Sequence, residues 1–201
     1  MKSKLYAFTH KPEQTLAKYP DHNQKISARY ARAIAYFRIP RLESAIKEID
    51  VLLNEYPDNP WFYELKGQML FENGRVSLAI LPFTKAVSLR PKDALFRLSL
   101  ARAQLENNSP LDIQDAISNL QIATQLEPNY SPHWYFLGIG YGRNNEFTKS
   151  NLALAEASLL QRDYKDAIYL AEKVKRDSLI GSPQHLRAED IFNSASNRIN
   201  R

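Results

Sequence analysis

A recurring helix stop is the strongest constraint on how this chain folds. The segments YPDN at 56–59, RPKD at 90–93 and EPNY at 127–130 follow one another at spacings of 34 and 37 residues. Proline lacks an amide hydrogen and clashes with the preceding turn, so each segment ends one helix and allows another to start. A period of this size is typical of arrays in which each repeat is one supersecondary unit. The spacing therefore predicts an array of helix pairs.

Apolar residues between these stops recur at helical spacing. Ala45, Ile49 and Leu52 lie about one turn apart in the segment 41–56, as on one face of an amphipathic helix. A small residue also returns within each unit, where two helices must approach closely. These small residues are Ala33, Gly67, Ala101 and Gly138.

The period and the small positions resemble those of tetratricopeptide-repeat proteins over about residues 24–175. Trp134, Leu137, Gly138 and Tyr141 reproduce the family's W-x2-L-G-x2-Y signature. The resemblance implies an all-α fold: a tetratricopeptide superhelix, or α-solenoid, of about ten antiparallel helices with a C-terminal capping helix.

The expected organisation has three parts. After Tyr141 the register breaks, because no second helix with the expected alanine follows, and we expect the helix at 151–161 to pair with the one at 164–174. The predicted parts are a basic lead-in with a short helix at 1–23, a repeat array at 24–181 with units at 26–59, 60–93, 94–130, 131–147 and 148–181, and a capping helix at 182–201.

The charge of the chain is unevenly distributed. The net charge is +5, and residues 1–50 hold ten Lys or Arg against five Asp or Glu, whereas the remainder holds 17 of each. These basic residues are spread singly and form no run, which favours a solvated basic face over a nucleic-acid patch. We therefore disfavour nucleic acid as a partner.

The residues that catalysis or metal binding would need do not form a recognisable constellation. The chain has no cysteine, and its four histidines are isolated, with no H-E-x-x-H, no G-x-S-x-G and no phosphate-binding glycine loop. His133, beside Trp134, is expected in the first turn of a repeat helix. The sequence predicts no catalytic residue, no metal site and no cofactor, and it contains neither a signal peptide nor an apolar run long enough to span a membrane.

The first helix of each pair is expected to face a concave groove. The residues predicted there are largely apolar and aromatic, which favours a protein or peptide partner, a hydrophobic peptide or an intramolecular segment, or a partner domain stacked on this face. Glu64 and Gln68 stand where a carboxylate clamp would have Lys and Asn, so a clamp for a C-terminal carboxylate is disfavoured. The predicted groove residues are Tyr30, Phe37, Arg38, Trp61, Glu64, Gln68, Arg102, Tyr135 and Arg143.

Longer segments of this chain resemble a narrower group of proteins. They are similar to the C-terminal repeat tail of the BepA and HtpX-related family of bacterial zinc metalloproteases. The resemblance implies a periplasmic location and, as partners, a protease domain or a component of the outer-membrane assembly machinery. If the chain is complete as given, its lack of a signal peptide implies the cytoplasm instead. No metal ligand of that family has a matching position here. The similar segments are KLYAFTHKPE, ARYARAIAYFR, DNPWFYELKGQML, LALAEASLLQRDYKDAIYLAEKV and GSPQHLRAEDI.

Two functions follow as hypotheses. The first is a noncatalytic interaction scaffold that binds a peptide or partner protein in its concave groove. The alternative is the regulatory or substrate-recognition C-terminal part of a periplasmic zinc metalloendopeptidase involved in outer-membrane protein quality control.

Overall fold

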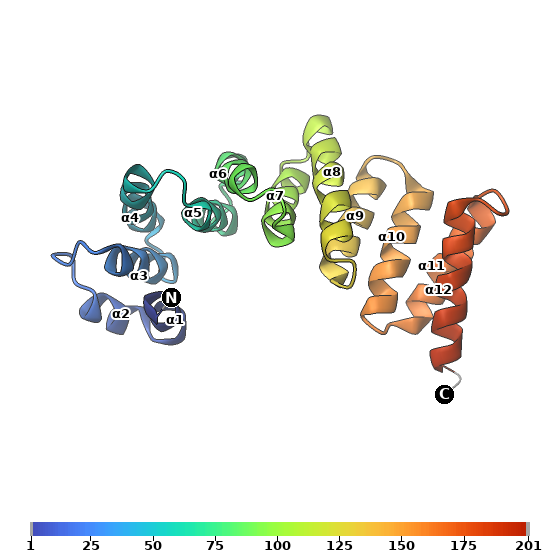
Figure 1. The fold of residues 1–201 in the computed structure, drawn as a ribbon, viewed down its shortest axis with the longest axis horizontal. Coiled ribbons are helices and arrows are strands. Elements are labelled where there is room, and N and C mark those ends of the chain that lie inside the picture. The colour runs from blue at the N-terminus through green and yellow to red at the C-terminus, as the bar shows by residue number, and fades with distance from the viewer. Residues whose placement is uncertain (1, 200–201) are drawn as a thin grey trace. The chain divides into compact units, whose positions relative to one another are not determined.

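A computed structural model describes residues 2–199, and every regular element in that range is a helix (Figure 1). The all-α prediction is confirmed, with twelve helices in the described range where about ten were expected. Residues 1, 200 and 201 of the predicted lead-in and capping helix lie outside the described residues. The chain divides into two compact units: unit 1 comprises the described residues up to Pro91, and unit 2 those from Lys92 onward.

Unit 1 contains six helices, the first two of which lie in the predicted lead-in. One short helix is expected in that segment, whereas it holds α1, which packs against α3, and α2. The helix pairs of this unit are α3 with α4 and α5 with α6. The bounds are α1 Lys2–Thr9, α2 Pro12–Lys18, α3 Ile26–Phe37, α4 Leu42–Glu55, α5 Pro60–Glu72 and α6 Val76–Leu89.

The predicted helix stop at 56–59 lies between the end of α4 and the start of α5. Helix α4 ends at Glu55, and Pro60 takes the first position of α5, where its missing amide hydrogen costs no helical hydrogen bond. The side chain of Asn59 accepts a hydrogen bond from the Trp61 amide at 3.1 Å, which caps α5. Local sequence thus fixes the position at which the second pair begins.

A buried ion pair ties the α2–α3 loop to the core of unit 1. Arg32 is 1% exposed, and its guanidinium donates to both carboxylate oxygens of Glu48 on α4, at 2.8 and 3.1 Å. The same guanidinium donates to the backbone oxygens of Pro20 and Asn23 at 2.9 and 2.8 Å. One side chain therefore holds the loop, α3 and α4 together.

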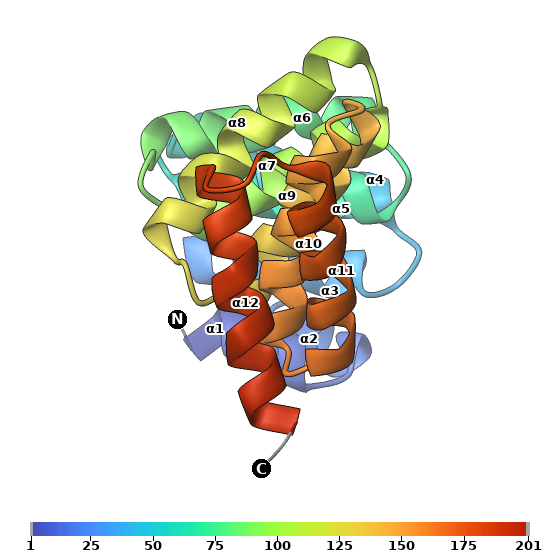
Figure 2. The ribbon, with the colours of Figure 1, turned by 90° about the vertical axis from the view of Figure 1, so that its right-hand side faces the viewer.

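Unit 2 contains the other six described helices. Figure 2 shows α11 and α12 side by side, joined by a short loop. In this unit α7 packs with α8, α9 with α10, and α11 with α12. The bounds are α7 Ala94–Asn107, α8 Pro110–Leu126, α9 Ser131–Arg143, α10 Phe147–Leu160, α11 Tyr164–Asp177 and α12 Pro183–Ile199.

The prediction that the register breaks after Tyr141 is wrong. Helix α10 starts at Phe147, four residues before the predicted start, and packs against α9. It also packs against α11, so the expected contact between the helices at 151–161 and 164–174 forms, and α11 packs in turn against α12. The boundary predicted between 147 and 148 therefore falls inside a helix. Asn145 adopts a positive φ of 61° and allows the short turn between α9 and α10.

The small residue of the second helix is Ser150, which occupies the place that Ala79 takes in α6, twelve residues after the glycine of the first helix. Its hydroxyl donates to the Gly138 carbonyl at 2.8 Å, and both residues are buried. The prediction required an alanine at this place, whereas a serine fits equally well because its hydroxyl is hydrogen-bonded.

Candidate functional site

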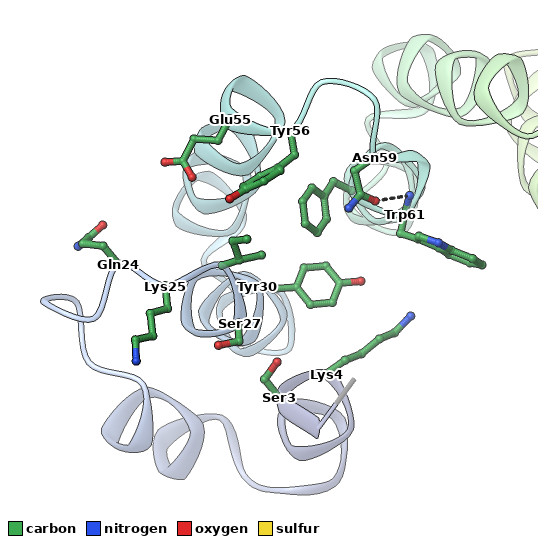
Figure 3. Close-up of a pocket in the computed structure, with 12 residues that line it drawn as sticks. Ser3, Lys4, Gln24, Lys25, Ser27, Tyr30, Glu55, Tyr56, Asn59 and Trp61 are labelled. Carbon is green, nitrogen blue, oxygen red and sulfur yellow. Dashed lines mark hydrogen bonds between the residues drawn. The ribbon is translucent and has the colours of Figure 1, made fainter.

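A cavity of about 840 Å³ opens in unit 1 where α1, the starts of α3 and α5, and the end of α4 meet. We call it the aromatic pocket, after Tyr30, Tyr56, Trp61 and Phe62, which share its lining (Figure 3). Its volume lies in the range of pockets that hold small ligands or large peptide side chains. The other lining residues are Ser3, Lys4, Gln24, Lys25, Ile26, Ser27, Glu55 and Asn59.

The aromatic rings pack in a chain. The centroid of Phe62 lies 5.4 Å from that of Tyr30 and 6.4 Å from that of Tyr56, the latter edge to face. Phe62 and Tyr30 belong to the buried core of unit 1, whereas Trp61 is 43% exposed. Tyr56 is 40% exposed as well, so the pocket has a buried aromatic floor and two accessible aromatic side chains, Tyr56 and Trp61.

Tyr30 presents a hydroxyl that stays protonated. Burial, and then the negative charge of Glu64, raise the pKa of Tyr30 to about 12. The hydroxyl is therefore a permanent hydrogen-bond donor at physiological pH. In Figure 3 it points to the same side of the pocket as the ammonium group of Lys4.

Cations surround the exposed indole. The ammonium nitrogen of Lys4 lies 5.9 Å from the Trp61 ring centroid, and the guanidinium carbon of Arg90 lies 5.4 Å from it. Lys25 also lines the pocket, and Glu55 lies on the far side of Tyr56 from Trp61. The pocket thus combines an apolar floor with a basic edge.

The wall formed by Gln24 and Lys25 depends on the buried ion pair. These residues follow Asn23, whose carbonyl accepts from Arg32. Arg32 is therefore a positioning residue, since it fixes the loop that closes one side of the pocket.

The structure separates the predicted groove residues of unit 1. Tyr30 and Trp61 both line the aromatic pocket. Arg38 does not, because its guanidinium donates to the carbonyl oxygens of Ala7 and His10 at the end of α1. It stabilises that helix end, where a positive charge is favourable.

The three remaining predicted residues of unit 1 also lie outside the pocket lining. Phe37 is half-buried against the core of the unit. Glu64 is half-buried and acts on Tyr30 through its charge, and the amide of Gln68 donates to the Glu72 carboxylate at 2.8 Å.

In unit 2, two of the three predicted residues meet at one aromatic ring. The guanidinium carbon of Arg102 lies 5.3 Å from the Phe136 ring centroid, and Tyr135, 46% exposed, packs edge to face on the same ring at 5.4 Å. Arg143 has another role: its guanidinium donates to the Leu105 carbonyl near the end of α7. Like Arg38, Arg143 therefore uses its guanidinium to donate to a backbone carbonyl near the end of another helix.

Sequence reasoning missed the contribution of α1. Ser3 and Lys4 fall in the predicted lead-in. The apolar residues of α1 show no helical periodicity that would predict its packing against α3. Phe62 and Tyr56 carried a signal, since they lie at the first stop next to the predicted Trp61. The cluster of aromatic residues at the start of α5 was the sequence signal that could have indicated the pocket.

Neither a metal-binding cluster nor a membrane span occurs in the described range. Among residues 2–199 no cluster of three or more His, Asp or Glu side chains is placed to hold a metal ion. No helix in the same range has the length and apolarity needed to cross a bilayer.

The fold defines the class: an all-helical repeat protein, whose first unit contains the aromatic pocket. Residues 30–94 match the family model described as Tetratricopeptide repeat. Residues 30–94 therefore contain tetratricopeptide repeats, as the sequence predicted.

Two relatives differ in length from this chain. Human Tetratricopeptide repeat protein 13 is 34% identical over 147 residues, which are 71% of this chain and 17% of the relative. The Beta-barrel assembly-enhancing protease of Escherichia coli K12 is 27% identical over 164 residues, 82% of this chain and 33% of the relative. The chain thus spans a third or less of the length of these proteins.

Solved structures share the fold. YrrB, described as a TPR protein with an unusual peptide-binding site, has a TM-score of 0.69 at 20% identity, covering 85% of this chain and 88% of its own. A MamA structure has a TM-score of 0.69 at 17% identity, covering 81% and 96%. At this identity the likeness concerns the fold alone.

Proposed function

We propose that this protein is a noncatalytic interaction scaffold and that the aromatic pocket of unit 1 binds a peptide segment of a partner protein. One observation carries the proposal: a cavity of about 840 Å³ with four aromatic residues in its lining, two of which, Tyr56 and Trp61, are exposed. Exposed aromatic side chains beside a preformed pocket are typical anchors for partner binding. The unusual peptide-binding site of YrrB, a protein of the same fold, supports the proposal.

The test fills the pocket without disturbing the core. Ser27 lines the pocket, is exposed, and is the second residue of α3. Ser27→Phe places a ring in the cavity. Ser77→Phe is the matched control, because Ser77 is exposed at the second position of α6 and does not line the pocket.

Peptides are selected from a displayed random library on the wild-type protein and then bound to both variants. We expect the selected peptides to bind Ser77→Phe as they bind the wild type, and to bind Ser27→Phe at least about tenfold more weakly, since a rotamer-restricted ring excludes the guest. Selected peptides that bind all three proteins equally would rule out the pocket as the binding site.

The predicted concave face of unit 2 is a second contact area within the same proposal. Arg102 and Tyr135 meet at Phe136, so Arg102→Ala with Tyr135→Ala removes both exposed partners of that ring. We expect partner capture to weaken while far-UV circular dichroism keeps the wild-type helicity. An unchanged pull-down yield from the double variant refutes this area as a contact.

A second function is the one that the protease relative suggests: the regulatory or substrate-recognition part of a periplasmic zinc metalloendopeptidase in outer-membrane protein quality control. The 27% identity over 82% of this chain favours it. In that setting the partner is a protease domain or an outer-membrane assembly component. Translation of the coding DNA upstream of Met1 tests it, and the lack of an in-frame H-E-x-x-H contradicts it.

A further inference from the structure

We infer that the segment bound in the aromatic pocket is acidic: a bulky apolar side chain enters the cavity while neighbouring Asp or Glu residues meet its basic edge. The inference rests on the proposed function, because it specifies the chemistry of the bound peptide.

The distribution of charge between the two units is the first observation. Residues 1–91, which form unit 1, contain 14 Lys or Arg against nine Asp or Glu, whereas residues 92–201 contain 13 of each. The whole net charge of +5 therefore belongs to the unit with the aromatic pocket. A net positive unit attracts acidic segments and accelerates their association.

The second observation is local. Lys4 and Arg90 both lie over the Trp61 ring, and Lys25 lines the pocket from the other side. Two carboxylates oppose them: Glu64 acts on Tyr30, and Glu55 points away beyond Tyr56. Lys4 and Arg90 both approach the exposed indole, and an apolar guest that stacks there brings its neighbouring residues within reach of Lys4.

Two further donors favour an acidic neighbour. The Tyr30 hydroxyl points to the same side as Lys4 (Figure 3) and can donate to a carboxylate. Helix α3 starts at the pocket with Lys25 as its N-cap residue, which offers no side-chain acceptor, and its first turn contains no acidic residue. The positive end of this helix adds to the two lysines, whereas Asn59 already caps α5.

The probe is a fluorescein-labelled peptide, blocked at both ends, in which one phenylalanine is flanked by aspartates. Three matched peptides replace the aspartates by asparagines, the aspartates by lysines, or the phenylalanine by alanine. Binding to the full chain is measured by fluorescence anisotropy at low and at physiological salt. We expect the acidic phenylalanine peptide to bind most tightly and to weaken as salt rises, because exposed charges are screened.

Charge reversal at the edge then identifies the contact. Lys4→Glu is compared with Lys85→Glu, an exposed lysine on α6 that does not line the pocket. We expect Lys4→Glu to weaken the acidic peptide about five- to tenfold and to strengthen the lysine peptide, as reversal turns attraction into repulsion. Because Lys85→Glu changes the net charge equally, it should change either affinity less than about twofold.

The outcomes separate the inference from the function. If the asparagine peptide binds as tightly as the acidic one, and Ser27→Phe abolishes both, the pocket binds peptides and the acidic preference is wrong. If no phenylalanine peptide binds above its alanine control, the peptide-binding function fails together with the inference. A single-stranded oligonucleotide that displaces the acidic peptide and binds more tightly identifies this face as a nucleic-acid site and overturns the inference. A second copy of the chain as the occupant would instead appear as concentration-dependent self-association that Ser27→Phe abolishes, and it would overturn the inference as well.

Discussion

Replacement of His133 by phenylalanine is expected to stabilise the protein. His133 is fully buried in the first turn of α9; its Nδ1 lies 3.4 Å from the Glu127 carbonyl oxygen, and its Nε2 has no hydrogen-bond partner among the described residues. Phe62 and Phe96 hold the equivalent place in α5 and α7, five residues before the small position of each helix. The architecture therefore accepts an apolar ring where this repeat has a polar one.

The magnitude follows from the unsatisfied nitrogen. A buried polar atom without a partner costs about 1 to 3 kcal/mol, and its removal recovers that cost. The larger phenyl ring loses part of the gain to tighter packing, although it keeps the edge-to-face contact with Tyr130, now at 4.8 Å between centroids. We expect the free energy of unfolding to rise by about 1 to 2 kcal/mol near neutral pH.

The pH dependence provides the sharper test. Burial lowers the pKa of His133, against the opposing effects of the hydrogen bond to the Glu127 backbone and of the Glu127 charge. The folded protein thus favours the neutral ring, whereas the unfolded chain takes up a proton near pH 6.5. The contribution of His133 to stability is therefore complete above about pH 6.5 and is lost as the pH falls through and below that value.

Urea unfolding followed by far-UV circular dichroism at several pH values between about 8 and 5 measures both effects. His133→Phe should flatten the loss of stability below about pH 6.5. His22→Gln, at an exposed histidine, is the control and should change the unfolding free energy by less than about 0.5 kcal/mol. Parallel pH profiles for wild type and His133→Phe would refute the reasoning, as would a variant less stable at every pH.

Two further substitutions test the packing. Arg32→Ala removes the bidentate partner of Glu48, which keeps its ion pair with Arg29 at 3.0 Å, and leaves the carbonyls of the α2–α3 loop without this donor. Urea unfolding should therefore show a loss of about 2 kcal/mol, and a loss below about 0.5 kcal/mol would contradict the structural role of Arg32. Gly138→Leu overpacks the α9–α10 contact, because a Cβ at Gly138 would already lie 2.6 Å from Leu154 Cγ, and should cost about 1 to 3 kcal/mol in thermal or urea unfolding. A Gly138→Leu variant as stable as the wild type would show that the two helices separate freely.

Local signals in the sequence were sufficient for the helix pairs. The stops at 56–59, 90–93 and 127–130 act through proline chemistry, and the small positions act through sterics at close helix contacts. Both depend on residue type at a fixed place along the chain. The one break in this reasoning, after Tyr141, came from expecting alanine where Ser150 satisfies the same space with a buried hydrogen bond.

The predicted groove residues show that helical periodicity does not predict which groups a long side chain contacts. Helical period places Arg38 and Arg143 on the face of the first helices, but both guanidinium groups reach backbone carbonyls near the ends of other helices. A long flexible side chain binds wherever an unpaired acceptor lies within its reach. Such acceptors lie on segments distant in sequence, which periodicity does not bring together.

Residue types and their spacing along the chain were enough to predict antiparallel helix pairs with tetratricopeptide spacing, and a positive charge concentrated near the start of the chain. The packing of the helices alone brings Lys4 of α1 near Trp61, and it places the loop that Arg32 holds on the other side of the same pocket. The physical reason is one of distance along the chain. Repeat periodicity reports contacts within a turn or between adjacent helices, whereas the aromatic pocket is assembled from α1, α3, α4 and α5, whose shared surface appears only when the helices pack.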